Sequence, residues 1–197
     1  MVKLTSHFNK KLHVVFLSIC LLILATFTLS IGIVLLALLN IQNPIYLLLF
    51  ISINFALSFI ILPYVIANHL YKFRVFKLEK VLFYKIFSII SILLILVLIL
   101  DLYLNVVYYF LVVSIAEEYL FREIIFKILQ KEFPILYVYI IGSILFAFVL
   151  HINEPLLINL IIRFPSALFL NFLRSKFNLF TCITTHWIYN LIVVEFI

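Results

Sequence analysis

The most constraining feature of the chain is a succession of apolar runs, each about as long as a lipid bilayer is thick. The runs have approximate limits at 13–39, 44–66, 84–104, 106–129, 134–152, 155–173 and 177–197. A helix that crosses the hydrocarbon core needs about 20 mainly apolar residues, and these runs fit with some tilt. The sequence therefore predicts an all-α fold, a polytopic bundle of about seven transmembrane helices.

Composition excludes a water-soluble fold. Hydrophobic residues make up 68% of the 197 residues, charged residues make up 11%, and the mean hydropathy is +1.35. A soluble domain of this size has too little interior to hide that much apolar surface. The formal net charge is +6, but the basic residues flank apolar runs. We therefore expect them to set orientation in a lipid bilayer and expect no nucleic acid partner.

The charged residues between the predicted spans indicate an orientation. With seven spans, twelve basic residues fall on one side of the membrane: Lys3, Lys10, Lys11, Lys72, Arg74, Lys77, Lys80, Lys85, Lys127, Lys131, Arg174 and Lys176. Asp101, Glu154 and Glu195 fall on the other side. The positive-inside rule then predicts a multi-pass protein of the cell membrane with its N-terminus in the cytoplasm and its C-terminus outside.

Six of the polar side chains within the apolar runs of the second half of the chain are candidates for a functional site. They are Glu117, Glu118, Arg122, His151, His186 and Asn190. An ionised side chain in hydrocarbon is costly, so such residues need a partner, water or a function. Arg163, in the sixth run, is predicted to reach the interface or to pair with a carboxylate.

Helical spacing groups these residues. Glu118 and Arg122 are four residues apart and can pair on one helix face, which leaves Glu117 projecting about 100° away. His186 and Asn190 also share a face, because they too are four residues apart. Each pair taken alone has a structural explanation, as a buried ion pair or as hydrogen bonding between helices.

Depth in the bilayer is the second argument for one site. If the fourth and fifth runs form a hairpin that turns near Pro134, Glu117 and His151 lie at a similar depth of ~25 Å. His186 would lie ~15–18 Å from the basic turn that precedes the last span, and helix tilt could remove the difference. We therefore expect the polar residues of three spans to meet.

These residue types support hydrolytic chemistry. A carboxylate in a site of low dielectric can act as a general base toward water, and an imidazole can hold that water. A second imidazole and an amide can donate hydrogen bonds to an oxyanion. Glu117, His151 and His186 could instead bind a divalent metal such as zinc. The cofactor is therefore none or a metal, and the lack of a His-Glu-x-x-His helix favours the version without metal.

The order of the six residues resembles a known family. They occur as Glu117-Glu118-x-x-x-Arg122, then His151, then His186-x-x-x-Asn190. This order resembles the CPBP family of CAAX prenyl proteases and bacteriocin-processing enzymes, also called the Abi family. The resemblance covers roughly residues 106–191. It implies an intramembrane endopeptidase whose substrate is a membrane-associated peptide, such as a leader or a prenylated tail.

The resemblance also implies a role for each residue. Glu117 would activate water with help from His151, and His186 would stabilise the oxyanion together with Asn190. The remaining pair, Glu118 with Arg122, would support the site. The family is often called a metalloprotease family, although a mechanism without metal is also argued for it.

The second motif departs from the family pattern. The family usually has Phe four residues before the histidine, where this chain has Ala147 between Phe146 and Phe148. In an α-helix a shift of one residue moves a side chain by about 100° around the axis. The substitution therefore puts the shape of the substrate-facing wall in question more than the catalytic histidine.

The sequence thus predicts two parts, N-terminal spans over 1–105 and a catalytic core over 106–197. An alternative to proteolysis is a non-catalytic bacteriocin self-immunity or membrane scaffold protein that uses the same cavity for binding. A transporter with an acidic proton relay is disfavoured, because the chain shows no convincing repeat and has only two glycines.

Overall fold

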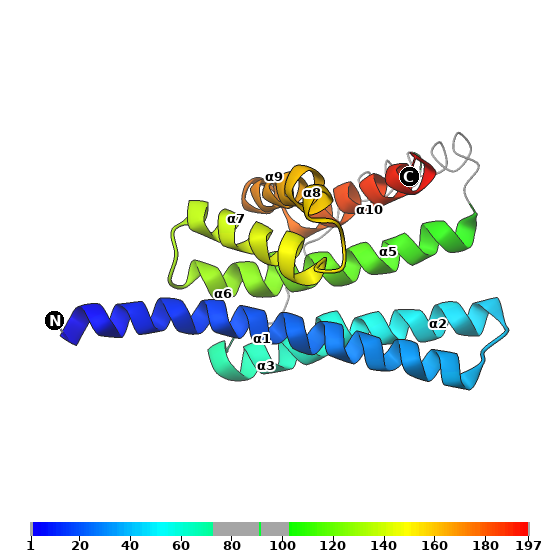
Figure 1. The fold of residues 1–197 in the computed structure, drawn as a ribbon, viewed down its shortest axis with the longest axis horizontal. Coiled ribbons are helices and arrows are strands. Elements are labelled where there is room, and N and C mark those ends of the chain that lie inside the picture. The colour runs from blue at the N-terminus through cyan, green and yellow to red at the C-terminus, as the bar shows by residue number, and fades with distance from the viewer. Residues whose placement is uncertain (1, 73–90, 92–102, 197) are drawn as a thin grey trace.

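A computed structural model describes residues 2–72, 91 and 103–196, and the part of the chain within these limits is helical without a β-strand (Figure 1). In the following list η denotes a π-helical segment. The elements are α1 (Val2–Leu39), α2 (Pro44–Phe55), η1 (Ala56–Ile61), α3 (Leu62–Tyr71), α5 (Leu104–Glu118), η2 (Tyr119–Ile125), α6 (Phe126–Gln130), α7 (Ile135–Ile144), η3 (Leu145–Leu150), α8 (Leu156–Ile158), η4 (Asn159–Arg163), α9 (Phe164–Lys176) and α10 (Leu179–Phe196). The predicted all-α class is confirmed.

The protein is a multi-pass membrane protein by the length and composition of its helices. Four described helices are long and apolar enough to cross a bilayer: Phe8–Leu39, Pro44–Tyr71, Leu104–Gln130 and Leu156–Lys176. Two further apolar helices, Ile135–Leu150 and Leu179–Val193, are shorter. These six correspond to six of the seven predicted spans. The remaining one, 84–104, falls almost wholly outside the described residues.

Residues at the ends of the helices explain where several of them begin and end. Asn43 caps α2, since its side chain accepts a hydrogen bond from the amide of Ile45 at 2.9 Å, and Pro44 occupies the first turn. α3 ends at Lys72, whose φ of 49° lies in the left-handed region. Pro134 precedes α7 and closes a short turn after α6. The predicted hairpin at Pro134 is therefore confirmed.

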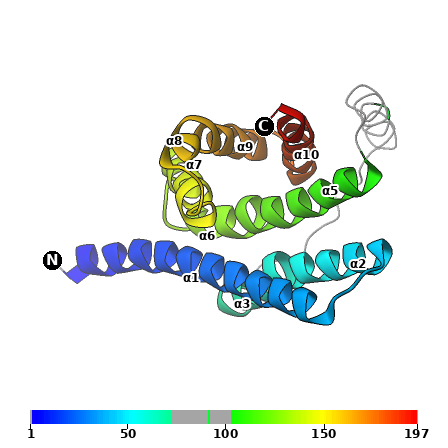
Figure 2. The same ribbon diagram turned by 45° about the vertical axis from the view of Figure 1, so that its right-hand side comes forward.

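The helix formed by α5, η2 and α6 lies in the middle of the molecule. Figures 1 and 2 show α1, α2 and α3 on one side of it and α7, α9 and α10 on the other. Its side chains are correspondingly buried, including Leu120, Phe121, Ile125 and Leu129. The charged residues in the middle of this helix, Glu117, Glu118 and Arg122, are thus buried by neighbours on both sides.

Basic residues from distant parts of the chain gather at one end of the bundle. Nζ of Lys11 lies 5.6 Å from the ring centroid of Phe133, in the turn between α6 and α7. In the same turn, Nζ of Lys131 lies 3.8 Å from the ring centroid of Tyr71, at the end of α3. The start of α1, the end of α3 and the end of α6 therefore lie together, as a common membrane side for these lysines requires.

Candidate active site

The predicted pair on the central helix is present and fully buried. Nε of Arg122 lies 3.1 Å from Oε2 of Glu118, and neither side chain is exposed. The guanidinium carbon of Arg122 also lies over two aromatic rings, 5.6 Å from the centroid of Phe121 and 5.2 Å from that of Phe146. Its Nη1 and Nη2 atoms have no hydrogen-bond partner among the described residues.

His186 joins this pair to Glu117. Its Nδ1 lies 2.9 Å from Oε1 of Glu118, and its Nε2 lies 3.8 Å from Oε2 of Glu117. An ionised carboxylate only accepts hydrogen bonds, so Nδ1 donates to Glu118 and Nε2 faces Glu117. Four of the six predicted residues therefore form one buried cluster, contributed by α5, η2 and α10.

Two hydrogen bonds hold α10 against α5. Nε1 of Trp187 donates to the carbonyl of Val107 at 2.9 Å, and Nδ2 of Asn190 lies 3.4 Å from Oγ of Ser114. The face that carries His186 and Asn190 consequently points toward the central helix. Ser114 was not predicted, although it lies three residues before Glu117 and so near the same helix face.

A π-helical segment accounts for the altered second motif. In η3 the backbone follows an i→i+5 pattern, which accommodates one residue more than an α-helical turn. Phe146 lies five residues before His151. In the wider π turn it therefore occupies the position that the fourth residue before the histidine would occupy in an α-helix. Its ring centroid lies 5.0 Å from that of His151 and 6.0 Å from that of His186. Ala147 is instead fully buried in the packing of the helix.

His151 lies at the end of η3 and is connected to Arg163. Nη1 of Arg163 lies 3.4 Å from Nε2 of His151, and Nη2 donates to Oε1 of Glu154 at 2.8 Å. The prediction that Arg163 pairs with a carboxylate is thus confirmed. Asn159 fixes the turn after η3, because its Nδ2 donates to the carbonyl of His151 at 2.8 Å.

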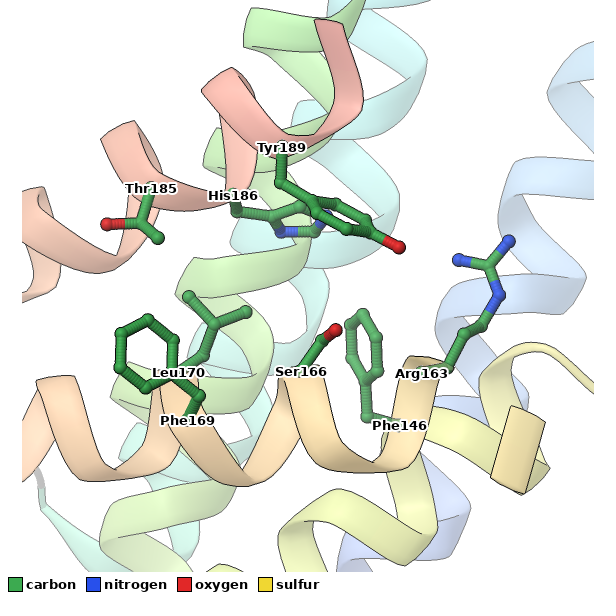
Figure 3. Close-up of a pocket in the computed structure, with 8 residues that line it drawn as sticks. All are labelled: Phe146, Arg163, Ser166, Phe169, Leu170, Thr185, His186 and Tyr189. Carbon is green, nitrogen blue, oxygen red and sulfur yellow. The ribbon is translucent and has the colours of Figure 1, made fainter. Parts of the chain in front are cut away.

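Two cavities share part of their walls, and one of them borders the cluster. The smaller, about 160 Å³, lies between α9, α10 and η3 and includes His186 and Phe146 in its wall (Figure 3). The larger, about 330 Å³, includes Asn190. Arg163 and Tyr189 line both cavities. Sequence reasoning missed Tyr189, although its place between His186 and Asn190 in the last motif was a usable signal.

The proposed metal ligands do not form a metal site among the described residues. No group of three or more His, Cys, Asp or Glu side chains in this part of the chain is placed to hold a metal ion. Nε2 of His151 faces the guanidinium of Arg163, whose positive charge would repel a divalent cation. The residues present therefore do not fit the zinc set of Glu117, His151 and His186.

The second half of the chain matches the sequence model of a protein family. Residues 99–192 match the sequence model of a family described as type II CAAX prenyl endopeptidase Rce1-like. No curated protein and no solved structure matches the chain. The matched region contains all six polar residues that the sequence singled out.

Proposed function

Since residues 99–192 form an Rce1-like domain of the CPBP (Abi) family of type II CAAX prenyl endopeptidases, we propose that the protein is an intramembrane endopeptidase. It hydrolyses a peptide bond of a membrane-associated substrate, either a leader or a prenylated tail. The catalytic core comprises residues 106–197, and residues 1–105 supply the N-terminal spans that precede it in the chain. Seven spans, with the N-terminus in the cytoplasm and the C-terminus outside, complete the proposed topology.

One observation carries the proposal: the buried cluster of two carboxylates, one guanidinium and one imidazole. With His186 protonated, the charges of Glu117 and Glu118 are balanced by those of Arg122 and His186. A buried cluster needs such balance, because an isolated charge in a medium of low dielectric is costly. Glu117 is the member that lacks a close ion-pair partner, since its nearest such contact is His186 Nε2 at 3.8 Å. It is therefore the carboxylate free to act on water.

Hydrolysis begins when Glu117 removes a proton from water and the water oxygen attacks the peptide carbonyl carbon. His151 holds that water through its Nδ1–H group, since its Nε2 accepts from Arg163. Arg122 and Glu118 keep His186 oriented through the Nδ1 contact. Apart from the attacking water and the substrate, the groups that take part in these steps are side chains of the protein.

The tetrahedral intermediate then carries a negative oxygen that requires hydrogen-bond donors. Nε2–H of the protonated His186 and the amide of Asn190 are the donors that we propose for this oxyanion. Glu117 returns its proton to the leaving nitrogen, the carbon–nitrogen bond breaks, and a free acid and a free amine are formed. This assignment makes Glu117 the base first and the acid afterwards.

The test is cleavage of a farnesylated CAAX peptide by purified protein in lipid nanodiscs, with products identified by mass spectrometry. We expect hydrolysis that persists when a chelator has removed divalent metal. A reaction abolished by chelator and restored by zinc would contradict the mechanism without metal. Binding without any product would instead support the immunity or scaffold alternative.

A further inference from the structure

Arg163 lies in the wall that the two cavities share. One cavity reaches His186 and the other reaches Asn190, and Arg163 lines both. Figure 3 shows the hydroxyl of Tyr189, which also lines both cavities, pointing toward the guanidinium of Arg163. A cation and a hydroxyl group therefore lie beside both approaches to the proposed catalytic residues.

The guanidinium has donors that its present partners do not use. Nη2 donates to Oε1 of Glu154 at 2.8 Å, and Nη1 makes a long contact of 3.4 Å with His151. Nε has no hydrogen-bond partner among the described residues. A guanidinium can offer a planar fork of two parallel donors to a carboxylate. Glu154 takes only one of them, so the pair leaves this capacity unfilled.

Separation of Glu154 from Arg163 should cost little free energy. Glu154 belongs to the turn between η3 and α8, and its side chain is 37% exposed, against 25% for Arg163. An ion pair between partly exposed groups contributes little, because water solvates both charges when they separate. An incoming carboxylate can thus replace Glu154, whose turn the proposed topology puts at the outer surface of the membrane.

We propose, on the basis of the proposed function, that Arg163 and Tyr189 form a carboxylate-binding subsite that holds an acidic group of the substrate beside the scissile bond. The apolar wall around it, which includes Phe146, Phe169 and Leu170, accepts neighbouring apolar side chains. Two sources supply the required chemistry: the α-carboxylate of a nearby C-terminus, or the side chain of an aspartate or glutamate. Arg163 acts here as a specificity-determining residue.

Binding of three fluorescent S-farnesyl tetrapeptides to the Glu117→Gln variant in nanodiscs tests the proposal. The peptides differ only at the end: a free C-terminus, a C-terminal amide, and an amide whose last residue is glutamate. We expect one acidic peptide to bind on the order of 10- to 100-fold more tightly than the plain amide, as a charged hydrogen bond provides. The preferred peptide identifies the source of the carboxylate.

Two further substitutions in the Glu117→Gln variant distinguish a role of Arg163 in binding the carboxylate from a role in holding the fold. Arg163→Gln should abolish the preference for the acidic peptide. Glu154→Gln breaks the same ion pair but keeps the guanidinium, so the preference should persist or increase. Loss of the preference in Glu154→Gln, or equal binding of all three peptides before either substitution, would overturn the proposal, and neither result requires that Arg163→Gln folds.

Cleavage by the wild-type protein provides a separate readout. Selective binding of an acidic peptide without any hydrolysis would support the subsite while contradicting the endopeptidase proposal. Hydrolysis at equal rates with all three peptides would support the endopeptidase and overturn the subsite. The failure of one claim is thus distinguishable from the failure of the other.

Discussion

Arg122 is among the largest fully buried side chains of the described residues, and a single carboxylate pairs with it. Its remaining stabilisation comes from the faces of Phe121 and Phe146. Cation–π contacts of this kind gain strength where water is excluded. The charge of Arg122 is therefore tolerable only while Glu118 and the two rings stay in place.

Removal of one partner of this pair should destabilise the protein. Arg122→Leu leaves Glu118 buried beside His186 without its guanidinium, a change that costs ~3–5 kcal/mol for buried pairs. We expect a large loss of folded protein, measured by size-exclusion chromatography in detergent. The double variant Glu118→Gln with Arg122→Leu should recover part of that loss.

Lys127 offers a control for this experiment. It pairs with Glu123 one turn further along, but its side chain is 37% exposed. Lys127→Gln should cost less than about 1 kcal/mol, as partly exposed pairs do. A double variant of Glu118 and Arg122 as poor as the sum of its single variants would show that the two side chains do not interact.

Sequence spacing predicted the contact between Glu118 and Arg122, because residues four apart on one helix lie next to each other on its surface. The contact between Glu118 and His186 could not be obtained in this way. It joins residues 68 positions apart, and it depends on how α10 packs against α5. The estimated difference in depth between His186 and Glu117 did not anticipate their contact either, in which Nε2 of His186 lies 3.8 Å from Oε2 of Glu117.

At the scale of elements, the π-helical segments determine where the polar residues point. η2 begins directly after Glu118, and η3 ends directly before His151. Such segments insert one residue into an α-helix and are frequent at functional sites. In η3 the insertion turns Phe146 rather than Ala147 toward the histidines.

Deletion of Val149 tests this account of η3. The deletion places Phe146 four residues before the histidine, and the π turn can relax to an α turn with the same side chains facing the site. We therefore expect folded yield and peptide hydrolysis close to those of the unmodified protein. Chromatography in detergent and the mass-spectrometric assay measure the two quantities.

Deletion of Ile140 is the matched control, because it falls in α7 where no π segment can absorb it. Tyr139 and Ser143 lie on either side of it, and both contact Asn171 on α9, at 3.2 Å and 3.0 Å. A rotation of about 100° between them would break this connection. If the Val149 deletion proved as damaging as that of Ile140, the compensating role of η3 would be refuted.

The lengths of the apolar runs predicted the existence and approximate limits of the six described helices, because bilayer thickness sets the length of a spanning helix. They could not predict the π segments. An extra residue in one turn leaves the apolar composition unchanged, and all positions of a buried helix are apolar. The deviation of the second motif at Ala147 was visible in the sequence, but its structural compensation was not.

At the scale of the whole molecule, the gathering of Lys11 and Lys131 at one end supports the proposed orientation. A phosphatase that is active only outside the cytoplasm should be active when fused to the C-terminus. The same enzyme inserted in the turn between α6 and α7, beside Lys131, should be inactive. Activity in the turn and inactivity at the C-terminus would overturn the orientation. The same result at both positions would contradict the three spans that the count of seven puts between them.

The sequence predicted a multi-pass membrane protein because so apolar a chain exposes a surface that a lipid bilayer solvates and water does not. The division of the chain at residue 105 stays a prediction, because the third predicted span, which ends there, lies almost wholly outside the described residues. The two cavities that Arg163 and Tyr189 line were beyond prediction, because they arise where η4 and α10 face each other. Composition thus determines the surroundings of the protein, and packing determines its site.

The most direct measurement for the central claim compares the hydrolysis rates of Glu117→Gln and Glu123→Gln in nanodiscs at equal amounts of folded protein. Both substitutions remove one carboxylate with little change in volume. Glu123 binds Arg174 and Lys127 outside the buried cluster. We expect a loss of at least ~10²-fold for Glu117→Gln, as for removal of a general base, and near-normal hydrolysis for Glu123→Gln. Hydrolysis by Glu117→Gln at the wild-type rate would refute the role of Glu117 as the base.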